Sequence, residues 1–274
     1  MRIAVTGARG RLGSAVVGRA VAAGHRVLGL DLVGDEEDLS ESLSYRRLDA
    51  TSFEAVARAF EGCDAVVHLA AHTSPRGRAF EVHNDNVIAS YNALIAAAEL
   101  GITRVCQASS INAIGAAFSR WPRYDYFPLD EAHPTYNEDP YSLSKWICEI
   151  QADSVARAFP EITIASMRLH ALVPDYETRA QRLAGASPEQ VAKDLWGFTT
   201  TDGAASACLA ALTARYEGHE VFYIVARRTA SVEPSQDLRK RYYPEVPVRE
   251  ELVGNRAFYD SSKAESMLGW VDER

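Results

Sequence analysis

The sequence predicts an α/β fold in which a doubly wound parallel sheet carries a small C-terminal cap. Strand-like and helix-like runs alternate through the first two thirds of the 274 residues. The strand-like runs are almost continuously apolar, and a glycine-rich loop joins the first strand to the first helix. Continuously apolar strands indicate a parallel sheet that helices cover on both faces. Because ligands of such sheets bind beyond the carboxyl ends of the strands, we expect the chemistry there.

The predicted elements follow one another in a regular order. Apolar runs predict strands at 2–6, 26–30, 44–48, 64–69, 104–108 and 162–168, and helical periodicity predicts helices at 11–23, 52–60, 86–100 and 141–159. Residues 115–140 are too long for a simple turn and favour a binding loop. Short elements follow at 195–200, 204–215 and 221–225, before a tail that ends at Trp270. We therefore expect a sheet domain at 1–170. Residues 171–274 are expected to form mostly a substrate-binding cap, with some elements returning to the sheet.

Composition and charge exclude several functional classes. The chain is 47% hydrophobic and 24% charged, which is ordinary for a globular enzyme. Its formal net charge of -8 argues against a nucleic-acid or anionic-membrane partner, because such partners require a basic patch. The four cysteines are far apart and lack metal-ligand spacing, so we expect reduced thiols and no metal. Residues 1–6 already form a predicted strand, and no run approaches the roughly 20 apolar residues of a membrane span, so the expected compartment is the cytoplasm.

The glycine-rich loop lies between the first predicted strand and the first predicted helix. It consists of Gly7, Ala8, Arg9, Gly10, Arg11, Leu12 and Gly13. Glycines at this spacing let backbone N–H groups approach a pyrophosphate, and the helix N-terminus adds a favourable partial positive charge. The loop therefore predicts a Rossmann-type dinucleotide site. A glycine-rich turn without a ligand is the alternative.

Asp31 ends the second predicted strand, 18 residues beyond Gly13. An acidic side chain at this place accepts hydrogen bonds from the adenosine ribose hydroxyls and repels the 2′-phosphate of NADP. The sequence therefore favours NAD over NADP and makes 1–170 the NAD-binding domain. Arg9 and Arg11 can instead turn towards a phosphate, or they can be solvated surface charges.

Two further segments complete the predicted cofactor site. Asp49, with Ala50 beside it, follows the third predicted strand and can accept a hydrogen bond from the adenine amino group. Asp49 also suits the N-cap of the next helix. Leu69, Ala70 and Ala71 end the fourth predicted strand, and their mostly small side chains leave room for a cofactor to pass.

Tyr141 and Lys145 are four residues apart and therefore lie on one face of the predicted helix at 141–159. Lowering a tyrosine pKa from about 10 to about 7 needs roughly 4 kcal/mol. A unit charge at about 4 Å in an effective dielectric of about 20 supplies that amount. We therefore expect Lys145 to lower the pKa of Tyr141, which makes the phenolate a usable base.

A second tyrosine–lysine pair has the same spacing. Tyr259 and Lys263 come after the alternating region, and we expect this copy to be non-catalytic. Tyr141 differs because Ser109 and Ser110 end the strand before its helix. Both serines are expected to face the crevice, where a hydroxyl can hold a substrate oxygen.

The chain resembles an extended short-chain dehydrogenase/reductase of the NAD-dependent epimerase/dehydratase family. The matching residues are Val5-Thr6-Gly7, Asp31, His68-Leu69-Ala70-Ala71, Asn86-Val87, Ser109-Ser110, Ile114-Gly115, Pro140-Tyr141, Lys145 and Met167-Arg168-Leu169 before Pro174. The resemblance implies that Tyr141 is the acid/base, and that Lys145 activates it and binds the nicotinamide ribose. Ser110, rather than Ser109, matches the serine that holds the substrate oxygen. Asn86 matches a family asparagine near the active-site helix, and a helix N-cap is its alternative role.

The resemblance also bears on the reaction. Family members are sugar dehydrogenases, or nucleotide-sugar epimerases and dehydratases with a larger C-terminal domain. Only 100 residues follow Pro174 here, which suits a free sugar or sugar acid. The chain looks most similar to the uronate dehydrogenases, which oxidise the C1 hydroxyl of a hexuronic acid to a lactone. The alternatives are an epimerase or dehydratase with tightly bound NAD and, from another class, a non-catalytic NAD-binding sensor. The family commonly dimerises, so we expect a homodimer through the helices at 86–100 and 141–159.

The predicted substrate contacts are Thr73, Ser110, Ile111, Asn112, His170 and Arg179. Arg179 can clamp a substrate carboxylate, with a solvated arginine as the alternative. His170 can be a ligand or a packed strand-end histidine. The chain departs from the uronate dehydrogenases at two places, with Ile111-Asn112 where they resemble Asn-His and His170-Ala171 where they carry Gly-Ser. The aromatic residues of the 115–140 loop, which include Trp121, Tyr124 and Tyr126, can stack on a sugar or fold the loop down.

Overall fold

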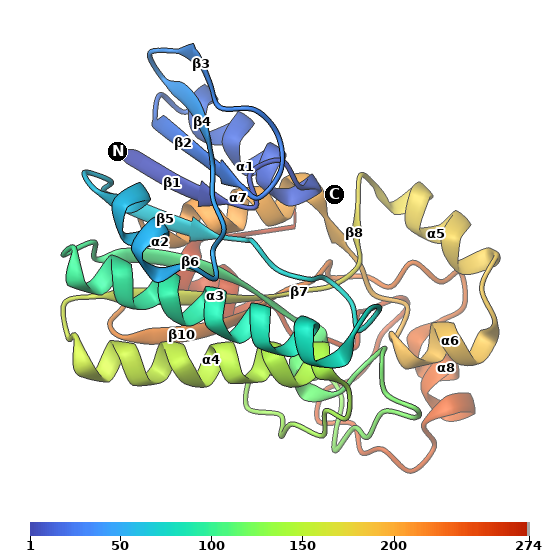
Figure 1. Cartoon of the computed structure of the whole chain (residues 1–274). Coiled ribbons are helices and arrows are strands. Elements are labelled where there is room, and N and C mark those ends of the chain that lie inside the picture. The colour runs from blue at the N-terminus through green and yellow to red at the C-terminus, as the bar shows by residue number, and fades with distance from the viewer. Residues whose placement is uncertain (273–274) are drawn as a thin grey trace.

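One eight-stranded sheet runs through the computed structural model, which describes residues 1–272 (Figure 1). Its strand order is β10-β7-β6-β5-β1-β2-β4-β3. The strands are β1 (Arg2–Thr6), β2 (Arg26–Asp31), β3 (Glu37–Ser40), β4 (Leu43–Arg47), β5 (Ala65–His68), β6 (Arg104–Ser110), β7 (Thr163–Leu169) and β10 (His219–Ile224). All neighbours pair in parallel except β3, which pairs antiparallel with β4 at the edge. The strand order reverses between β1 and β5, and this is where a doubly wound sheet opens a crevice.

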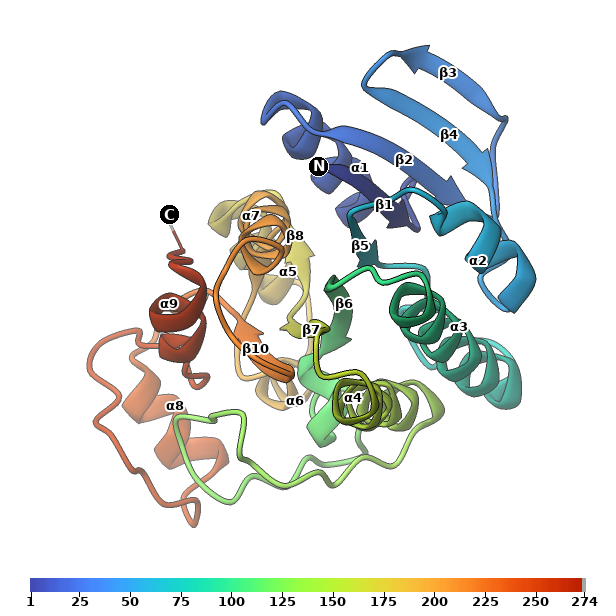
Figure 2. The same ribbon diagram turned by 90° about the vertical axis from the view of Figure 1, so that its left-hand side faces the viewer.

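Helices cover both faces of the sheet and confirm the predicted doubly wound architecture (Figure 2). On one face lie α2 (Phe53–Phe60), α3 (Ala79–Glu99) and α4 (Pro140–Ala158), which share an apolar core with β1, β5 and β7. On the other face lie α1 (Arg11–Ala22), α7 (Thr201–Ala211) and α9 (Ser262–Leu268). Alternate residues of the central strands enter the two cores, so the strands are apolar on both sides.

The first turn of α4 is fixed by its cap. Asp139 is the N-cap, and its side chain accepts hydrogen bonds from the backbone N–H groups of Tyr141 at 3.0 Å and Ser142 at 2.9 Å. Pro140 occupies the first helical position, where its missing N–H costs nothing. The carboxylate also stabilises the positive end of the helix dipole. This cap places Tyr141 in the first turn, beside the carboxyl end of β6.

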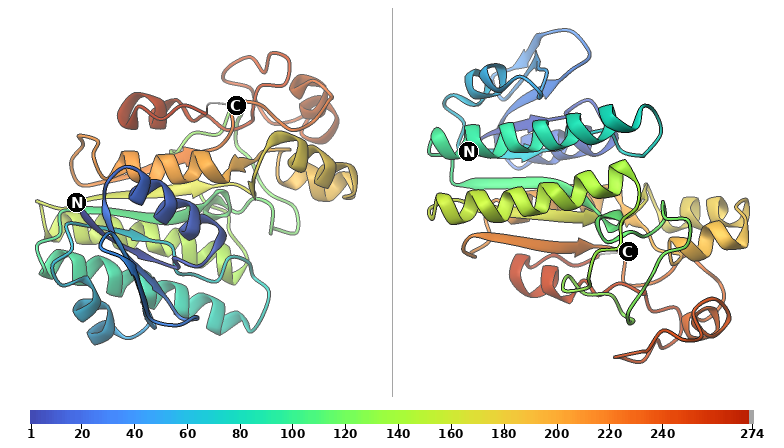
Figure 3. Two further views of the ribbon diagram at one scale, coloured as in Figure 1. Left: turned by 90° about the horizontal axis from the view of Figure 1, so that it is seen from above. Right: turned by 60° about the horizontal axis from the view of Figure 1, so that its bottom comes forward.

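The segment after β7 divides between the sheet and a second group of elements. Helix α7 and strand β10 return to the sheet, and β10 pairs with β7. The other elements are β8 (Leu172–Val173), α5 (Tyr176–Ala184), α6 (Pro188–Lys193), β9 (Thr199–Thr200) and α8 (Ser235–Tyr242). A third core joins α6 and α8 to the 115–140 loop, and Trp196 lies buried in it. Figure 3 shows α8 and this loop gathered at the side of the molecule away from β3 and β4.

Several elements differ from the sequence prediction. The hairpin strand β3 and helices α5, α6, α8 and α9 were not predicted, because their short polar segments carry little periodicity. Helix α3 begins at Ala79 rather than at residue 86. The element predicted at 195–200 is a strand only at its end, since Leu195 and Trp196 have a φ of 55°. Positions 273–274 of the predicted cap lie outside the described residues.

Three properties of residues 1–272 concern the predicted exclusions. All four cysteines are buried and free. His, Cys, Asp and Glu side chains do not gather in this range into a group of three or more able to hold a metal ion. None of the helices in it combines the length and the apolar character that a membrane crossing requires.

Candidate active site

Two cavities of about 660 and 670 Å³ open beyond the carboxyl ends of the central strands. They share the lining residues Gly7, Gly10, Leu69, Ala71 and Thr73, so they form one continuous crevice. The first cavity runs past Asp31, Asp49 and Ala50, and the second runs past Ser110, Tyr141 and Lys145. Their size and position are typical of a ligand site at a topological switch point.

The glycine loop between β1 and α1 has the geometry of a pyrophosphate cradle. Gly7 has a φ of +64°, and a Cβ at this position would lie 2.9 Å from the backbone nitrogen of Ala70. A Cβ on Gly13 would lie 2.0 Å from the carbonyl oxygen of Gly7. Among the described residues, no side chain caps the amino end of α1 at Gly10. The free N–H groups and the helix dipole therefore face the crevice, and these residues fit a dinucleotide phosphate.

Asp31 lies at the end of β2 and faces the first cavity. Its carboxylate accepts the backbone N–H of Arg9 at 2.9 Å and that of Val33 at 3.3 Å. The guanidinium of Arg9 turns away from it, donating to Glu37 at 2.7 Å and stacking on Tyr45 at 4.5 Å. The Glu37 hydrogen bond raises the pKa of Arg9. Asp31 therefore remains a hydrogen-bond acceptor, while Arg9 is held by the β3–β4 hairpin.

The remaining predicted arginine and the adenine segment also have defined contacts. Arg11 donates to the carbonyl of Leu172 at 2.8 Å. Asp49 lines the cavity, and its side chain accepts the N–H and the hydroxyl of Thr51 at 2.9 and 2.7 Å. The Thr51 hydroxyl lowers the pKa of Asp49. The alternative N-cap role is wrong, because the N-cap of α2 is Ser52.

Thr6 and His68 stabilise the segment at Leu69 and Ala70 that lines the crevice, and they were not predicted as site residues. The Thr6 hydroxyl accepts the N–H groups of Leu69 and Ala70, both at 3.1 Å. Its oxygen lies 2.9 Å from Nδ1 of His68. Burial, and secondarily the charge of Lys145, lowers the pKa of His68 to about 3. The matching Val5-Thr6-Gly7 stretch contained Thr6, but its role depends on a contact with a distant strand.

Tyr141 and Ser110 meet at the inner end of the second cavity. The Ser110 hydroxyl forms a hydrogen bond with the Tyr141 phenol that lowers the pKa of Tyr141. Ser110 also accepts the N–H of Asn112 at 3.1 Å, which starts a short 3-10 helix at 111–114. The ring of Phe118 packs edge-on against Tyr141 at 5.6 Å. The hydroxyls of Ser110 and Tyr141 therefore lie side by side, and the Phe118 ring packs against the tyrosine.

Lys145 lies one turn of α4 after Tyr141 and is buried. Its ammonium donates to the carbonyl of Ala108 at 2.8 Å and lies 5.9 Å from the centre of the Tyr141 ring. Burial lowers the pKa of Lys145 and raises the pKa of Tyr141 to about 12. The expected depression of the Tyr141 pKa by Lys145 is therefore not seen. Burial of the phenol is the largest cause of the raised pKa of Tyr141, and Lys145 is not among the groups that shift it.

Asn86 and Ser109 differ from their sequence interpretations. Asn86 lies inside α3, seven residues after its start at Ala79, so it is not a helix N-cap. Its side chain accepts the N–H of His72 at 2.8 Å and donates to Ser144 of α4 at 2.9 Å. Ser109 lines the second cavity together with Ser110, as expected, but its hydroxyl donates to the buried Glu149 at 2.5 Å. Successive strand residues point to opposite faces, so only Ser110 of the pair faces Tyr141.

The predicted substrate residues divide into two groups. Thr73, Ile111, Asn112 and His170 line the second cavity. Arg179 is not among its lining residues, because its buried guanidinium pairs with Asp194 at 2.5 Å. A carboxylate clamp by Arg179 is therefore not what this geometry offers.

Phe118 is the aromatic side chain of the 115–140 loop that lines the cavity, and it was not predicted. Trp121 stacks on Tyr243 at 5.7 Å, and the Tyr124 hydroxyl donates to the carbonyl of Lys193 at 2.9 Å. Tyr126 donates its hydroxyl to Asp130 within the loop. These three predicted aromatic residues therefore fold the loop down rather than line the crevice. No pattern in the sequence separates Phe118 from its neighbours.

The second tyrosine–lysine pair lies outside the crevice. Tyr259 is buried in the third core against His170 and Tyr223. Its hydroxyl has no hydrogen-bond partner among the described residues. Lys263 pairs with Glu220 at 2.7 Å. This geometry agrees with the prediction that the copy is non-catalytic.

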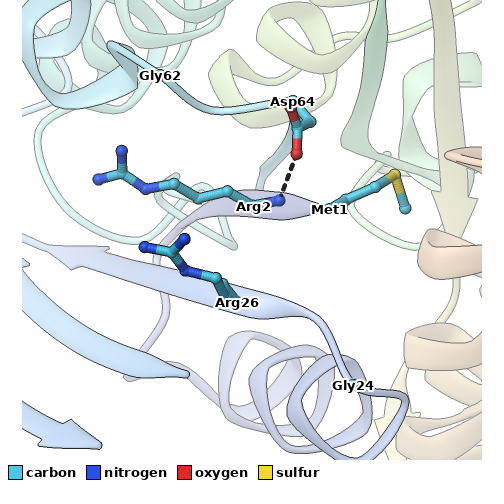
Figure 4. Close-up of a pocket in the computed structure, with 6 residues that line it drawn as sticks. All are labelled: Met1, Arg2, Gly24, Arg26, Gly62 and Asp64. Atoms are coloured by element: carbon cyan, nitrogen blue, oxygen red, sulfur yellow. Dashed lines mark hydrogen bonds between the residues drawn. The ribbon is translucent and has the colours of Figure 1, made fainter. Parts of the chain in front are cut away.

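A separate hollow lies at the opposite end of the sheet (Figure 4). It is lined by Met1, Arg2, Gly24, Arg26, Gly62 and Asp64. Figure 4 shows the side chains of Arg2 and Arg26 extending side by side from neighbouring strands. Asp64 accepts the backbone N–H of Arg2 at 2.6 Å. The hollow faces the amino ends of β1 and β2, so it is distant from Tyr141.

The model of the NAD-dependent epimerase/dehydratase family matches residues 3–224. The chain belongs to this family. This membership confirms the resemblance drawn from the motifs, and it covers the glycine loop, Ser110, Tyr141 and Lys145. The match ends at the last residue of β10, so the final part of the cap lies beyond it.

Individual family members are similar over part of their length. The chain is 26% identical over 183 residues to a dTDP-6-deoxy-L-talose 4-dehydrogenase (NAD(+)) of Aggregatibacter actinomycetemcomitans, covering 64% of this chain and 63% of that protein. It is 38% identical over 109 residues to an L-arabinose 1-dehydrogenase (NAD(P)(+)) of Haloferax volcanii, covering 40% and 41%. The chain therefore spans less than two thirds of these relatives.

Among solved structures, the fold is similar to that of a glucuronic acid dehydrogenase from Chromohalobacter salexigens. The TM-score is 0.72 with 22% identity, and the match covers all of this chain and 84% of the other. At this level of identity, the likeness shows a shared epimerase/dehydratase fold. It does not extend to the substrate.

Proposed function

We propose that this protein is an NAD-dependent oxidoreductase that oxidises a hydroxyl group of a sugar or sugar acid. One observation carries the proposal: Ser110, Tyr141 and Lys145 line the same crevice that runs over the glycine loop to Asp31. A substrate hydroxyl beside the phenol would therefore lie at the inner end of a dinucleotide site. Residues 1–170, together with α7, β10 and α9, would form the cofactor-binding domain, and the remaining elements after residue 170 would form the cap.

Three residues of the second cavity, Ser110, Tyr141 and Lys145, have distinct proposed roles. Ser110 donates a hydrogen bond to the substrate oxygen and orients it, and Tyr141 accepts the hydroxyl proton. Lys145 binds the nicotinamide ribose and keeps a positive charge near the phenol. When bound, oxidised NAD supplies the hydride acceptor and additional positive potential. Because burial raises the pKa of Tyr141 to about 12, the phenol needs these positive charges to act as a base near neutral pH.

NAD is the proposed cofactor in preference to NADP. Asp31 is positioned to accept hydrogen bonds from a ribose diol and would repel a 2′-phosphate. The nearest guanidinium, that of Arg9, is committed to Glu37 at 2.7 Å. These two features leave the ribose end of the crevice acidic. Gly7, Gly10, Leu12 and Gly13 would hold the pyrophosphate.

The proposed reaction is oxidation at C1 of a free sugar to a lactone. One curated relative, from Haloferax volcanii, is named an L-arabinose 1-dehydrogenase. This name agrees with a free monosaccharide in the cavity beside Ser110.

A sugar panel tests the proposal. The purified protein is incubated with NAD and a series of aldoses and uronic acids, and absorbance at the NADH wavelength is followed. A stoichiometric rise with at least one sugar, together with a lactone product, is expected. A parallel incubation with nucleotide sugars that gives an isomerised or dehydrated product without net NADH would instead select the epimerase or dehydratase alternative. Tight NAD binding without turnover of any candidate would select the sensor.

A further inference from the structure

A strained turn places Asp194 beside the second cavity, the one lined by Ser110, Tyr141 and Lys145. The next two residues, Leu195 and Trp196, both have a φ of 55°, in the left-handed region that non-glycine residues rarely adopt. Both side chains are buried. Two consecutive residues of this kind persist only where surrounding contacts determine the backbone, and such places cluster at functional sites.

Two buried side chains hold this turn. Arg179 pairs with Oδ2 of Asp194 at 2.5 Å, and its Nε donates to the carbonyl of Gly197 at 2.8 Å. His170 Nε2 lies 2.8 Å from the carbonyl oxygen of Asp194, and its Nδ1 accepts the N–H of Ala171 at 2.6 Å. Both ring nitrogens are therefore used by a neutral imidazole. Burial lowers the pKa of His170 to about 3.

The contacts of Arg179 and His170 hold the Asp194 carboxylate beside the second cavity. The Asp194 side chain is 16% exposed, and Asp194 lines the cavity with Gln190 and His170. Its Oδ1 accepts the N–H of Trp196 at 3.1 Å. Because a carboxylate oxygen has two lone pairs, both oxygens retain acceptor capacity for a ligand hydroxyl.

The cationic side chains that line the second cavity already have hydrogen-bond partners. Among the described residues that line it, the cationic side chains are Arg11 and Lys145. Arg11 opens α1 at the glycine loop and donates to Leu172, and Lys145 donates to Ala108. The guanidinium of Arg179 already pairs with Asp194. A substrate carboxylate at this place would therefore face the oxygens of Asp194, whose charge Arg179 already balances, and it would find no free cation to pair with.

We propose that Asp194, held by Arg179, is a specificity-determining residue that selects neutral sugars and rejects sugar acids. A neutral sugar donates hydroxyl hydrogen bonds to Asp194, whereas a uronate presents a carboxylate at the same place. This inference rests on the proposed sugar oxidation and narrows its substrate class. Arg179 then acts as a positioning residue for the turn rather than as a ligand of the substrate.

Pairs of sugars with the same ring configuration test the selection. D-glucose is compared with D-glucuronate, and D-galactose with D-galacturonate, in kcat/KM and in thermal stabilisation of the NAD-loaded protein. The neutral member of at least one pair should be preferred at least tenfold. Equal or better use of the acid overturns the inference while leaving the sugar oxidation intact. If no sugar gives NADH, the oxidation proposal fails, and thermal stabilisation by the acid alone would then contradict the role of Asp194.

Substitution locates the selection at one carboxylate. Asp194→Asn should reduce the preference for the neutral sugar at least fivefold, mainly by lowering the KM of the acid. Asp202→Asn is the matched control, since Asp202 forms an exposed ion pair with Arg19 on α1, and its preference should equal that of the wild type. An unchanged preference in a folded Asp194→Asn protein overturns the proposal. If this variant does not fold, the wild-type comparison still decides the matter.

Discussion

The environment of a few side chains sets the chemistry of the crevice. Asp139 fixes the first turn of α4, and that turn brings the Tyr141 phenol to the Ser110 hydroxyl. Lys145 follows one turn later, with its ammonium tied to Ala108. Each contact is local or crosses only to the neighbouring strand. At this scale the family motif and the geometry agree, except that burial raises the pKa of Tyr141, which the tyrosine–lysine spacing alone did not predict.

We predict that Glu37 controls the preference for NAD over NADP through its ion pair with Arg9. Glu37→Gln removes the charge that holds the Arg9 guanidinium at 2.7 Å, so the arginine can turn towards a 2′-phosphate. NADP should bind roughly tenfold tighter, while NAD affinity changes little. Calorimetric titration with each dinucleotide measures the effect. Asp38→Asn serves as the control, because Asp38 pairs with Arg46 on the same hairpin. Unchanged NADP affinity in Glu37→Gln would contradict this role.

At the scale of elements, long periodic segments were predicted and contact-dependent ones were not. The runs that became β1, β2, α1 and α4 have strong apolar patterns and clear end signals, so their positions follow from local physics. The start of α3 was misplaced because residues 79–85 carry no apolar stripe, and Val82 alone among them is buried. Asp194 was missed for a similar reason. Only the fold brings it to Arg179, which lies 15 residues earlier and was predicted as a free clamp.

Helices α3 and α4 pack against each other and lie side by side along their lengths (Figure 3). Their outer surface carries the exposed side chains of Ile88, Tyr91 and Ile150. We propose that a second copy covers this surface. Light scattering should give twice the chain mass of 30.0 kDa, and Ile150→Lys should shift it towards the monomer. Val232→Lys, on a fully exposed loop residue, should remain a dimer. A monomeric wild type at micromolar concentration would refute the proposal.

For the whole molecule, buried neutral histidines predict a loss of stability in acid. The folded-state pKa of both His68 and His170 is lowered to about 3, below the ordinary value of about 6.5. At a pH between these two values, the folded state therefore binds fewer protons than the unfolded state. The stabilisation that the two neutral histidines contribute is present above pH 6.5 and is lost as the pH falls towards 3. The free energy of unfolding should decrease by up to about 1.4 kcal/mol per pH unit for each histidine.

Denaturant unfolding at pH 7, 6 and 5 measures this slope. Most carboxylates have ordinary pKa values below this range, whereas burial raises the pKa of Glu131 and Asp194, and these two groups oppose the slope of the histidines. His170→Asn should reduce the slope, although its stability at pH 7 will also change. A slope in His170→Asn equal to that of the wild type would show that His170 is not held neutral by burial.

The most direct measurement compares Tyr141→Phe with Tyr259→Phe, since both tyrosines precede a lysine by four residues. Steady-state NADH formation with the best sugar of the panel is measured beside NAD affinity. Tyr141→Phe should lower kcat by about 10²–10⁴-fold with NAD affinity within about twofold of the wild type. Tyr259→Phe, which loses a hydroxyl without a partner, should keep both values. Retained turnover in Tyr141→Phe, or an equal loss in both variants, would contradict catalysis by the phenol in the crevice.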